Sequence, residues 1–444
     1  MQWRVLALAL SGFAVAVLNP PFQVCDESNH FFRAFQISEG NFNPSNPQRL
    51  PRGLLEFSYQ SLIQFHPLHG TRSGDIRGAL VELANENWDF GTRVDAWFPM
   101  TTAVYSPTSY LFSAAGIWLG RFLELSLLTQ FYLGRLANVL VGCLLLAFAL
   151  RLDHGIGRSF WTIAFIPVAL VQLASFSADA IANASAIAWV AWVTSRSRIL
   201  GLWPDRLVAT ALAIAVGLSK FAYAPMLLLA IAKRWHSRER RDTARIAVAS
   251  GLSAPLLWSL ICASRFQVGR PDSGVDPSAQ FASVLSNPMR FLDSIGAFFV
   301  HVMPDAIINM VGLLGWENNA VPYPLAICCL FWCVFIFWTD SRNLSANESR
   351  LAIPAIGITG GITSIVLGFL YVTWTPVGAQ MIDGFHGRYW IPMLPLLPVA
   401  LSLGGIRGEQ WSAQFARHRC TTIISPALGI TAVFWAIFER YHWL

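Results

Sequence analysis

Long apolar runs recur along the whole chain and decide what it can fold into. Roughly 17–24 residues at a time are nearly free of charge, which is long enough for a helix to cross the ~30 Å hydrocarbon layer of a bilayer. Charged residues make up only 13% of the chain, against about 25% in soluble proteins. We therefore expect an all-α fold, a polytopic bundle of transmembrane helices, because a membrane barrel would instead need alternating strands.

The apolar runs also predict the number of membrane helices. Spanning helices are expected at about 4–19, 130–151, 159–176, 180–196, 206–219, 221–233, 244–263, 321–338, 351–373, 388–405 and 421–438. Two further stretches, 105–121 and 291–312, either cross the membrane or lie along its outer surface, so the expected total is about 11–13. The first run lacks a small-x-small cleavage site and ends at Pro20-Pro21, which predicts an uncleaved signal anchor.

Positive charge in the connections predicts the orientation. Basic residues concentrate in the connections 151–158, 196–206, 233–245, 340–350 and 407–419, which the positive-inside rule places in the cytoplasm. The other connections then face outward, at about 20–100, 177–179, 220, 265–320 and 375–388. The net charge of +6 follows from these loops and does not indicate a nucleic-acid partner. We expect one domain over residues 1–444, with a helical first outer loop over 20–100.

The unusual polar residues gather on the outer side. They are Asp26, Glu27, His30, Arg33, Asp89, Arg93, Asp95, Asp179, Lys220, Asp305, Glu317, Asp383, His386 and Arg388. Polar groups near a membrane surface cost free energy unless they are paired or face a wet cavity. Any chemistry is therefore expected on the outer face.

The segment QVCDESNHFFRAFQISEG, which follows the first apolar run, has the pattern of a helix. Asp26 is a good N-cap residue and Gly40 a good terminator. Helical spacing places Asp26, His30 and Arg33 on one stripe, while the phenylalanines point mostly the other way. A purely structural interpretation also exists, in which Asp26 caps the helix and Glu27 favours its dipole.

The other outer candidates have similar alternatives. Asp179 and Asn183 share a helix face, which suits either a site or a cap with a buried amide. Lys220 either snorkels to the interface or holds an anion, and Arg388 either anchors a helix or binds a phosphate through both guanidinium edges. His66 and His69 form a weak metal-like pair that is more typical of a loop. No cysteine spacing indicates a disulfide framework or a zinc site.

Five segments in the same order resemble a known family. PPFQVCDESNHFFRAFQISEG, YSPTSYLFSAAGIWLGR, SFSADAIANA, GLSKFAYAP and GFHGRYWIPMLPLLP are similar to the bacterial membrane-protein family called domain of unknown function 2142, over about residues 20–400. One difference is Cys25, where the family pattern has proline. The family in turn resembles the GT-C glycosyltransferase superfamily.

The resemblance implies an activity and a site. GT-C enzymes take sugars from polyprenyl-phosphate carriers on the non-cytoplasmic face and carry acidic residues in the first outer loop, where Asp26 and Glu27 stand, with a second acidic position expected at Asp179. Asp26 would be the general base and Glu27 would orient the acceptor or a cation. Lys220 and Arg388 would hold the phosphate, with Arg33, His30 and His386 as helpers.

The expected partners and location follow from this resemblance. They are a polyprenyl-phosphate-linked sugar, an acceptor glycan, lipid or protein, and the bilayer of a bacterial inner membrane, with the site facing the periplasm or exterior. No nucleotide is expected at the site, and some GT-C enzymes need a divalent cation whereas others do not. The alternatives are a transporter or flippase of lipid-linked saccharides, an outer-face ligase or polymerase of polysaccharides, and a non-catalytic assembly protein of the cell envelope.

Overall fold

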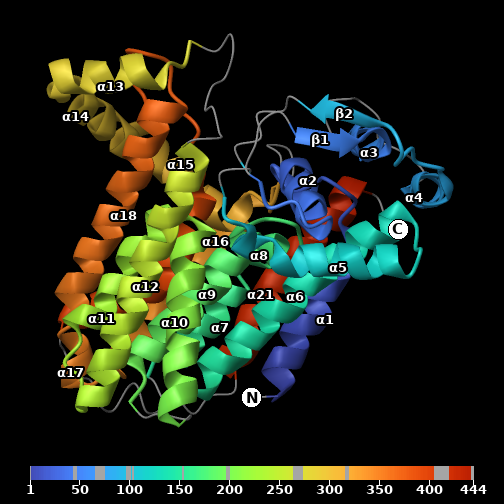
Figure 1. Cartoon of the computed structure of the whole chain (residues 1–444). Coiled ribbons are helices and arrows are strands. Elements are labelled where there is room, and N and C mark those ends of the chain that lie inside the picture. Colours follow the sequence, from blue (N-terminus) through green and yellow to red (C-terminus); the bar gives the residue numbers. More distant parts are fainter. Residues whose placement is uncertain are drawn as a thin grey trace.

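The computed structural model describes residues 2–43, 48–65, 76–96, 102, 105–152, 155–196, 201–263, 274–315, 320–404 and 420–441. Long helices form a bundle, and shorter helices with one small sheet cover one end of it (Figure 1). The predicted all-α polytopic fold is confirmed. The only described sheet is an antiparallel pair, β1 (Gln48–Pro51) and β2 (Arg93–Ala96).

Seven helices of the described residues are long and apolar enough to cross a membrane. They are α6 (Leu127–Arg151), α10 (Leu202–Ser219), α12 (Arg238–Ala263), α16 (Tyr323–Ser341), α18 (Ala352–Thr373), α21 (Cys420–Tyr441) and the continuous run Pro288–Gly312. That run consists of α14 (Pro288–Ala297), a π-helical turn η5 (Phe298–Val302) and α15 (Met303–Gly312). Two shorter apolar helical stretches are α1 (Gln2–Leu18) and η4 (Phe221–Leu228) with α11 (Leu229–Ala232).

Several predicted spans are not single long helices. The run at 159–176 forms α7 (Gly157–Ala164) and α8 (Pro167–Leu173), because Pro167 supplies no backbone N–H to continue the first helix. The run at 388–405 forms a 3₁₀ segment η6 (Gly387–Leu396), then α19 (Leu397–Leu401) and η7 (Ser402–Gly404). All residues of α9 (Asp179–Thr194) are buried, so protein rather than lipid surrounds this helix.

The stretch at 105–121, which the sequence left open, is divided. A 3₁₀ turn η3 (Pro107–Ser109) precedes α5 (Leu111–Phe122), whose 12 residues extend about 18 Å. A helix of that length is too short to cross a ~30 Å hydrocarbon layer alone. The other open stretch lies within the run Pro288–Gly312, which is long enough.

The segment predicted as the first outer loop contains, in its described residues, the expected helix and two further helices. It contains α2 (Glu27–Ser38), α3 (Arg52–Phe65) and α4 (Ile76–Asn85), besides the two strands. Gly40 follows α2 with a φ of +79°, as expected of a helix terminator. On the other side of α2, Phe31 is fully buried against the rings of Phe131 and Phe176, which fixes the helix to the bundle.

Basic connections meet at one end of the bundle. Arg158 forms an ion pair with Asp340 at 2.7 Å, and Arg196 forms one with Glu348 at 3.3 Å. The N-terminus and α17 (Ala346–Ser349) both lie at this end, and α2 lies at the opposite end (Figure 1). The connections that the sequence assigns to the cytoplasm therefore share one end, apart from 407–419, which lies outside the described residues.

A buried ion pair anchors the turn between α1 and α2. The carboxylate of Glu27 accepts hydrogen bonds from Arg135 Nε at 2.8 Å and Nη2 at 2.6 Å, and both side chains have 0% exposure. Arg135 also donates to the backbone carbonyls of Ala16, Asn19 and Pro20. The pair thus binds the end of α1 and the start of α2 to the middle of the bundle.

We expect Arg135→Met to destabilise the fold by about 3–5 kcal/mol, because Glu27 would be left as an uncompensated buried charge. The measurement is the detergent-solubilised yield and the midpoint of thermal unfolding. The double variant Glu27→Gln/Arg135→Met removes both charges and should recover part of the loss. A single variant as stable as the wild type would contradict the anchoring role of this pair.

Candidate functional site

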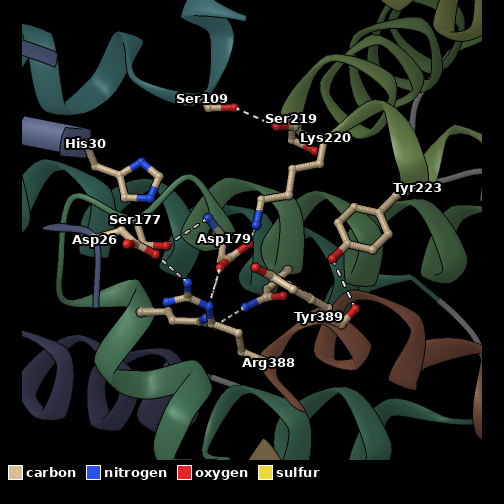
Figure 2. A network of polar contacts seen from close by, with 12 residues as sticks. Asp26, His30, Ser109, Ser177, Asp179, Ser219, Lys220, Tyr223, Arg388 and Tyr389 are labelled. Atoms are coloured by element: carbon tan, nitrogen blue, oxygen red, sulfur yellow. Dashed lines mark hydrogen bonds and ion pairs between the residues drawn. The ribbon is translucent and has the colours of Figure 1, made fainter. Parts of the chain in front are cut away.

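Four charged side chains from distant parts of the chain meet at the α2 end of the bundle (Figure 2). Arg388 Nη2 donates to Asp26 Oδ2 at 2.7 Å, and Arg388 Nε lies 3.9 Å from Asp179 Oδ2. Lys220 Nζ donates to the other oxygen, Asp179 Oδ1. We refer to Asp26, Asp179, Lys220 and Arg388 as the charged cluster.

Asp26 occupies the N-cap position of α2 but does not cap the helix. Its backbone is in the left-handed region, with φ 63° and ψ 8°, and its side chain makes no capping hydrogen bond. Asp tolerates this region better than most residues, although such a conformation still costs about 1–3 kcal/mol. The capping interpretation is therefore wrong, because the turned backbone directs the carboxylate to Arg388 instead.

Asp179 and Lys220 reach the cluster from two helix ends inside the bundle. Asp179 is the first residue of α9, and Gln172 Nε2 donates to its Oδ2 at 3.0 Å. Lys220 follows the last residue of α10 with an extended backbone, and Ser109 Oγ donates to the carbonyl of Ser219 at 3.3 Å. The helix break at Lys220 lets its side chain turn inward to Asp179.

Arg388 is positioned by a close approach of two backbones. It belongs to η6, which is 3₁₀ rather than α-helical and contains Pro392 and Pro395. A Cβ atom on the preceding residue, Gly387, would lie 2.0 Å from the carbonyl oxygen of Ala306 in α15. Glycine is therefore needed at 387 for this part of η6 to pack on α15.

The cluster is electrically balanced, and its members differ in exposure. Two carboxylates face two cations, yet the Asp26 side chain is 43% exposed, while those of Arg388 and Lys220 are 12% exposed and Asp179 is 3% exposed. Arg388 Nε has no hydrogen-bond acceptor among the described residues. Asp26 is thus the more accessible of the two carboxylates, whereas Arg388 Nε is buried and faces Asp179.

Two histidines flank the cluster in neutral form. His30 Nδ1 shares a hydrogen bond of 2.8 Å with the Tyr110 hydroxyl, and its ring is stacked with that of Tyr105. Burial lowers the pKa of His30 to about 4, and burial together with Arg388 lowers that of His386 to about 4. Burial raises the pKa of Asp26, but Arg388, with smaller contributions from His30 and His386, lowers it to about 2.

The remaining predicted residues lie elsewhere. Glu27 is enclosed by Arg135 and the backbone N–H groups of Phe22 and Phe176, so none of its surface is open to a ligand. Arg33 is fully buried and donates to Gln36 Oε1 and to two backbone carbonyls. The predicted stripe thus brings Asp26 and His30, but not Arg33, to the site. His66 and His69 lie outside the described residues.

The structure adds aromatic residues that sequence reasoning did not assign to the site. The ammonium of Lys220 lies 5.5 Å from the ring centroid of Tyr105 and 5.1 Å from that of Tyr389. The Tyr223 hydroxyl donates to the Tyr389 carbonyl at 3.0 Å. Tyr389 directly follows Arg388 in the sequence. This adjacency is the signal by which Tyr389 could have been assigned to the site.

A cavity of about 220 Å³ opens beside the cluster. Its lining includes His386, Arg388, Gln172 and Cys25, together with residues of η5 and α15. No group of three or more His, Cys, Asp or Glu side chains in the described ranges is arranged to hold a metal ion.

These features define a polytopic α-helical membrane protein with a balanced charged cluster and a small cavity at one end of its bundle. Comparison with known families agrees with this class. The family described as "predicted membrane protein (DUF2142)" matches residues 8–397, and the chain belongs to it. No curated protein and no solved structure matches the chain.

Because burial keeps His30 and His386 neutral, we expect the folded protein to lose stability in mild acid. Their pKa values lie below the ordinary value of 6.5, so the unfolded chain takes up protons first as the pH falls from about 6.5 to 4. At pH 5, His30 alone should cost about 2 kcal/mol relative to pH 7.5. The measurement is the drop in melting temperature between these two pH values for wild type and His30→Asn, which should show the smaller drop.

The matched control for this experiment is His236→Asn, since His236 is exposed at the other end of the bundle. It should show the same drop as the wild type. Equal drops for all three proteins would show that His30 is not the group that titrates.

Proposed function

We propose that this protein is a glycosyltransferase that moves a sugar from a polyprenyl-phosphate-linked donor to an acceptor glycan, lipid or protein. The observation that carries the proposal is the accessible Asp26 carboxylate, which is bound to Arg388 in a cluster that also holds the Lys220–Asp179 ion pair, at one end of a membrane bundle. A base and two cations in one cluster are the groups that displacement of a lipid phosphate by a hydroxyl requires.

In the proposed reaction, the acceptor oxygen forms a bond to the anomeric carbon while the bond from that carbon to the phosphate oxygen breaks. The proton of the acceptor hydroxyl passes to Asp26, and the electron pair of the broken bond remains on the polyprenyl phosphate. Lys220 and Arg388 stabilise the negative charge that builds on this phosphate. A single displacement inverts the configuration at the anomeric carbon.

Ligand binding would also activate the base. In the ligand-free cluster Arg388 is the main group that lowers the pKa of Asp26 to about 2, which makes this carboxylate a weak base. A donor phosphate competes with Asp26 for Nη2 of Arg388. Once Arg388 turns to the phosphate, the pKa of Asp26 rises toward its ordinary value, and the base becomes stronger only when the donor is present.

The position of the cluster suits a lipid carrier. Phe221, which follows Lys220, is 52% exposed on the outside of the bundle, where apolar surface faces lipid. A polyprenyl chain lying along that surface would present its phosphate to Lys220. With the basic connections inside, this end faces the periplasm or exterior of a bacterial inner membrane.

The first test of the proposal is Asp26→Asn, which keeps the size of the side chain and removes the base. We expect sugar transfer from polyprenyl-phosphoryl sugars to membrane acceptors to fall by about 10²–10⁴-fold at equal protein level. Transfer is measured as radiolabelled sugar incorporated into cell-envelope glycan in isolated membranes.

Asp95→Asn is the matched control, since Asp95 lies in the same outer loop with its side chain 58% exposed, and it should transfer sugar normally. Wild-type transfer in Asp26→Asn would refute the base assignment. Saccharide movement across the membrane without any transfer would favour the transporter instead.

A further inference from the structure

The cavity beside the charged cluster has a polar wall that the proposed mechanism leaves unused. His301, Asp305 and Asn309 all line this cavity. They stand four residues apart along η5 and α15, so they form one stripe on one helix face. All three are exposed, and no hydrogen bond or ion pair among the described residues occupies the Asp305 carboxylate or the Asn309 amide.

The opposite wall is part of the proposed active site. His386 and Arg388 line the same cavity as the stripe, and Gly387 between them contacts α15. The contact is close because a Cβ at Gly387 would lie 2.0 Å from Ala306 O and 2.6 Å from Met310 N. These two residues adjoin Asp305 and Asn309 in sequence, so the stripe is held at a fixed distance from Arg388 by backbone packing.

The dimensions and chemistry of the cavity suit one ring-sized polar molecule. Its volume of about 220 Å³ is well above the ~10–15 Å³ that one water needs and below the ~300 Å³ of the smallest drug-sized pockets. Carboxylate and amide groups accept and donate hydrogen bonds to vicinal hydroxyls. Phe385 and Val168 add apolar surface, which suits the C–H faces of a sugar ring.

From these observations we propose that the cavity between α15 and the His386–Arg388 segment is a subsite for a single sugar ring, whose hydroxyls hydrogen-bond to Asp305 and Asn309. The proposal rests on the proposed glycosyltransferase function. It adds the residues that select the sugar, which are separate from Asp26, Lys220 and Arg388.

The test is direct binding by the full-length protein in detergent. Saturation-transfer NMR with a panel of methyl hexosides reports which sugar binds the wild type, and the same sugar is then tested on Asp305→Asn and Asn309→Ala. We expect the signal to fall at least fivefold in both variants. Asp293→Asn, an exposed aspartate of α14 outside the cavity, is the matched control and should keep the wild-type signal.

A polyprenyl-phosphoryl hexose carrying the same sugar identifies the origin of the ring. If the cavity holds the donor sugar, this lipid-linked hexose displaces the methyl hexoside. If the cavity holds the acceptor, the methyl hexoside stays bound. Either result supports the subsite. Binding unchanged in Asp305→Asn and Asn309→Ala, or no binding of any panel sugar by the wild type, would overturn it.

Failure of the subsite is distinguishable from failure of the enzyme. Asp26→Asn should still bind the sugar while losing transfer, because Asp26 does not line the cavity. Normal transfer in Asp26→Asn refutes the base, whereas normal binding in Asp305→Asn refutes only the subsite.

Discussion

The buried ion pair between Glu27 and Arg135 is the interaction on which the site depends. An isolated charge in a protein interior costs several kcal/mol, so each partner requires the other. Arg135 also donates hydrogen bonds to the backbone carbonyls at the end of α1, and Glu27 accepts hydrogen bonds from two backbone N–H groups. Together they fix both sides of the turn that carries Asp26, and this allows a left-handed backbone at Asp26 to persist.

Given that anchored turn, the four charges of the cluster are brought together by helix ends. Lys220 and Asp179 lie where α10 ends and α9 begins, and Arg388 opens a 3₁₀ segment. Each side chain therefore comes from the end or start of a helical segment or from the turn before α2, inside a well-packed bundle. The arrangement keeps two cations at one end of the bundle without net charge, and it leaves one carboxylate accessible.

Much of the fold follows from the sequence, because long apolar runs have few alternatives to membrane helices. The runs located the seven long apolar helices of the described residues, yet they did not show that proline divides the stretch at 159–176 into α7 and α8, or that protein encloses α9. Hydropathy measures how apolar a segment is, not what surrounds it. Helix spacing correctly joined Asp26 and His30, but it could not detect that Arg33 bonds to the loop after α2.

The role of Glu27 was beyond sequence reasoning for a related reason. Its partner Arg135 lies 108 residues away, and the only signal was an arginine within the apolar run of α6. The cavity likewise brings α15 and Arg388 together across more than seventy residues of sequence. The sequence therefore marked Asp305 as an unusual polar residue but could not show that it lines the same cavity as Arg388. Contacts between segments so far apart in the sequence become visible only in the packed bundle.

In the proposed mechanism, Arg388 releases Asp26 and binds the phosphate of a lipid carrier. The most direct measurement is a cryo-electron microscopy structure of the full-length protein with decaprenyl phosphate bound. The account predicts the phosphate within hydrogen-bonding distance of Lys220 and Arg388, and Asp26 released from Arg388. A phosphate bound elsewhere, with the contact between Asp26 and Arg388 intact, would contradict it.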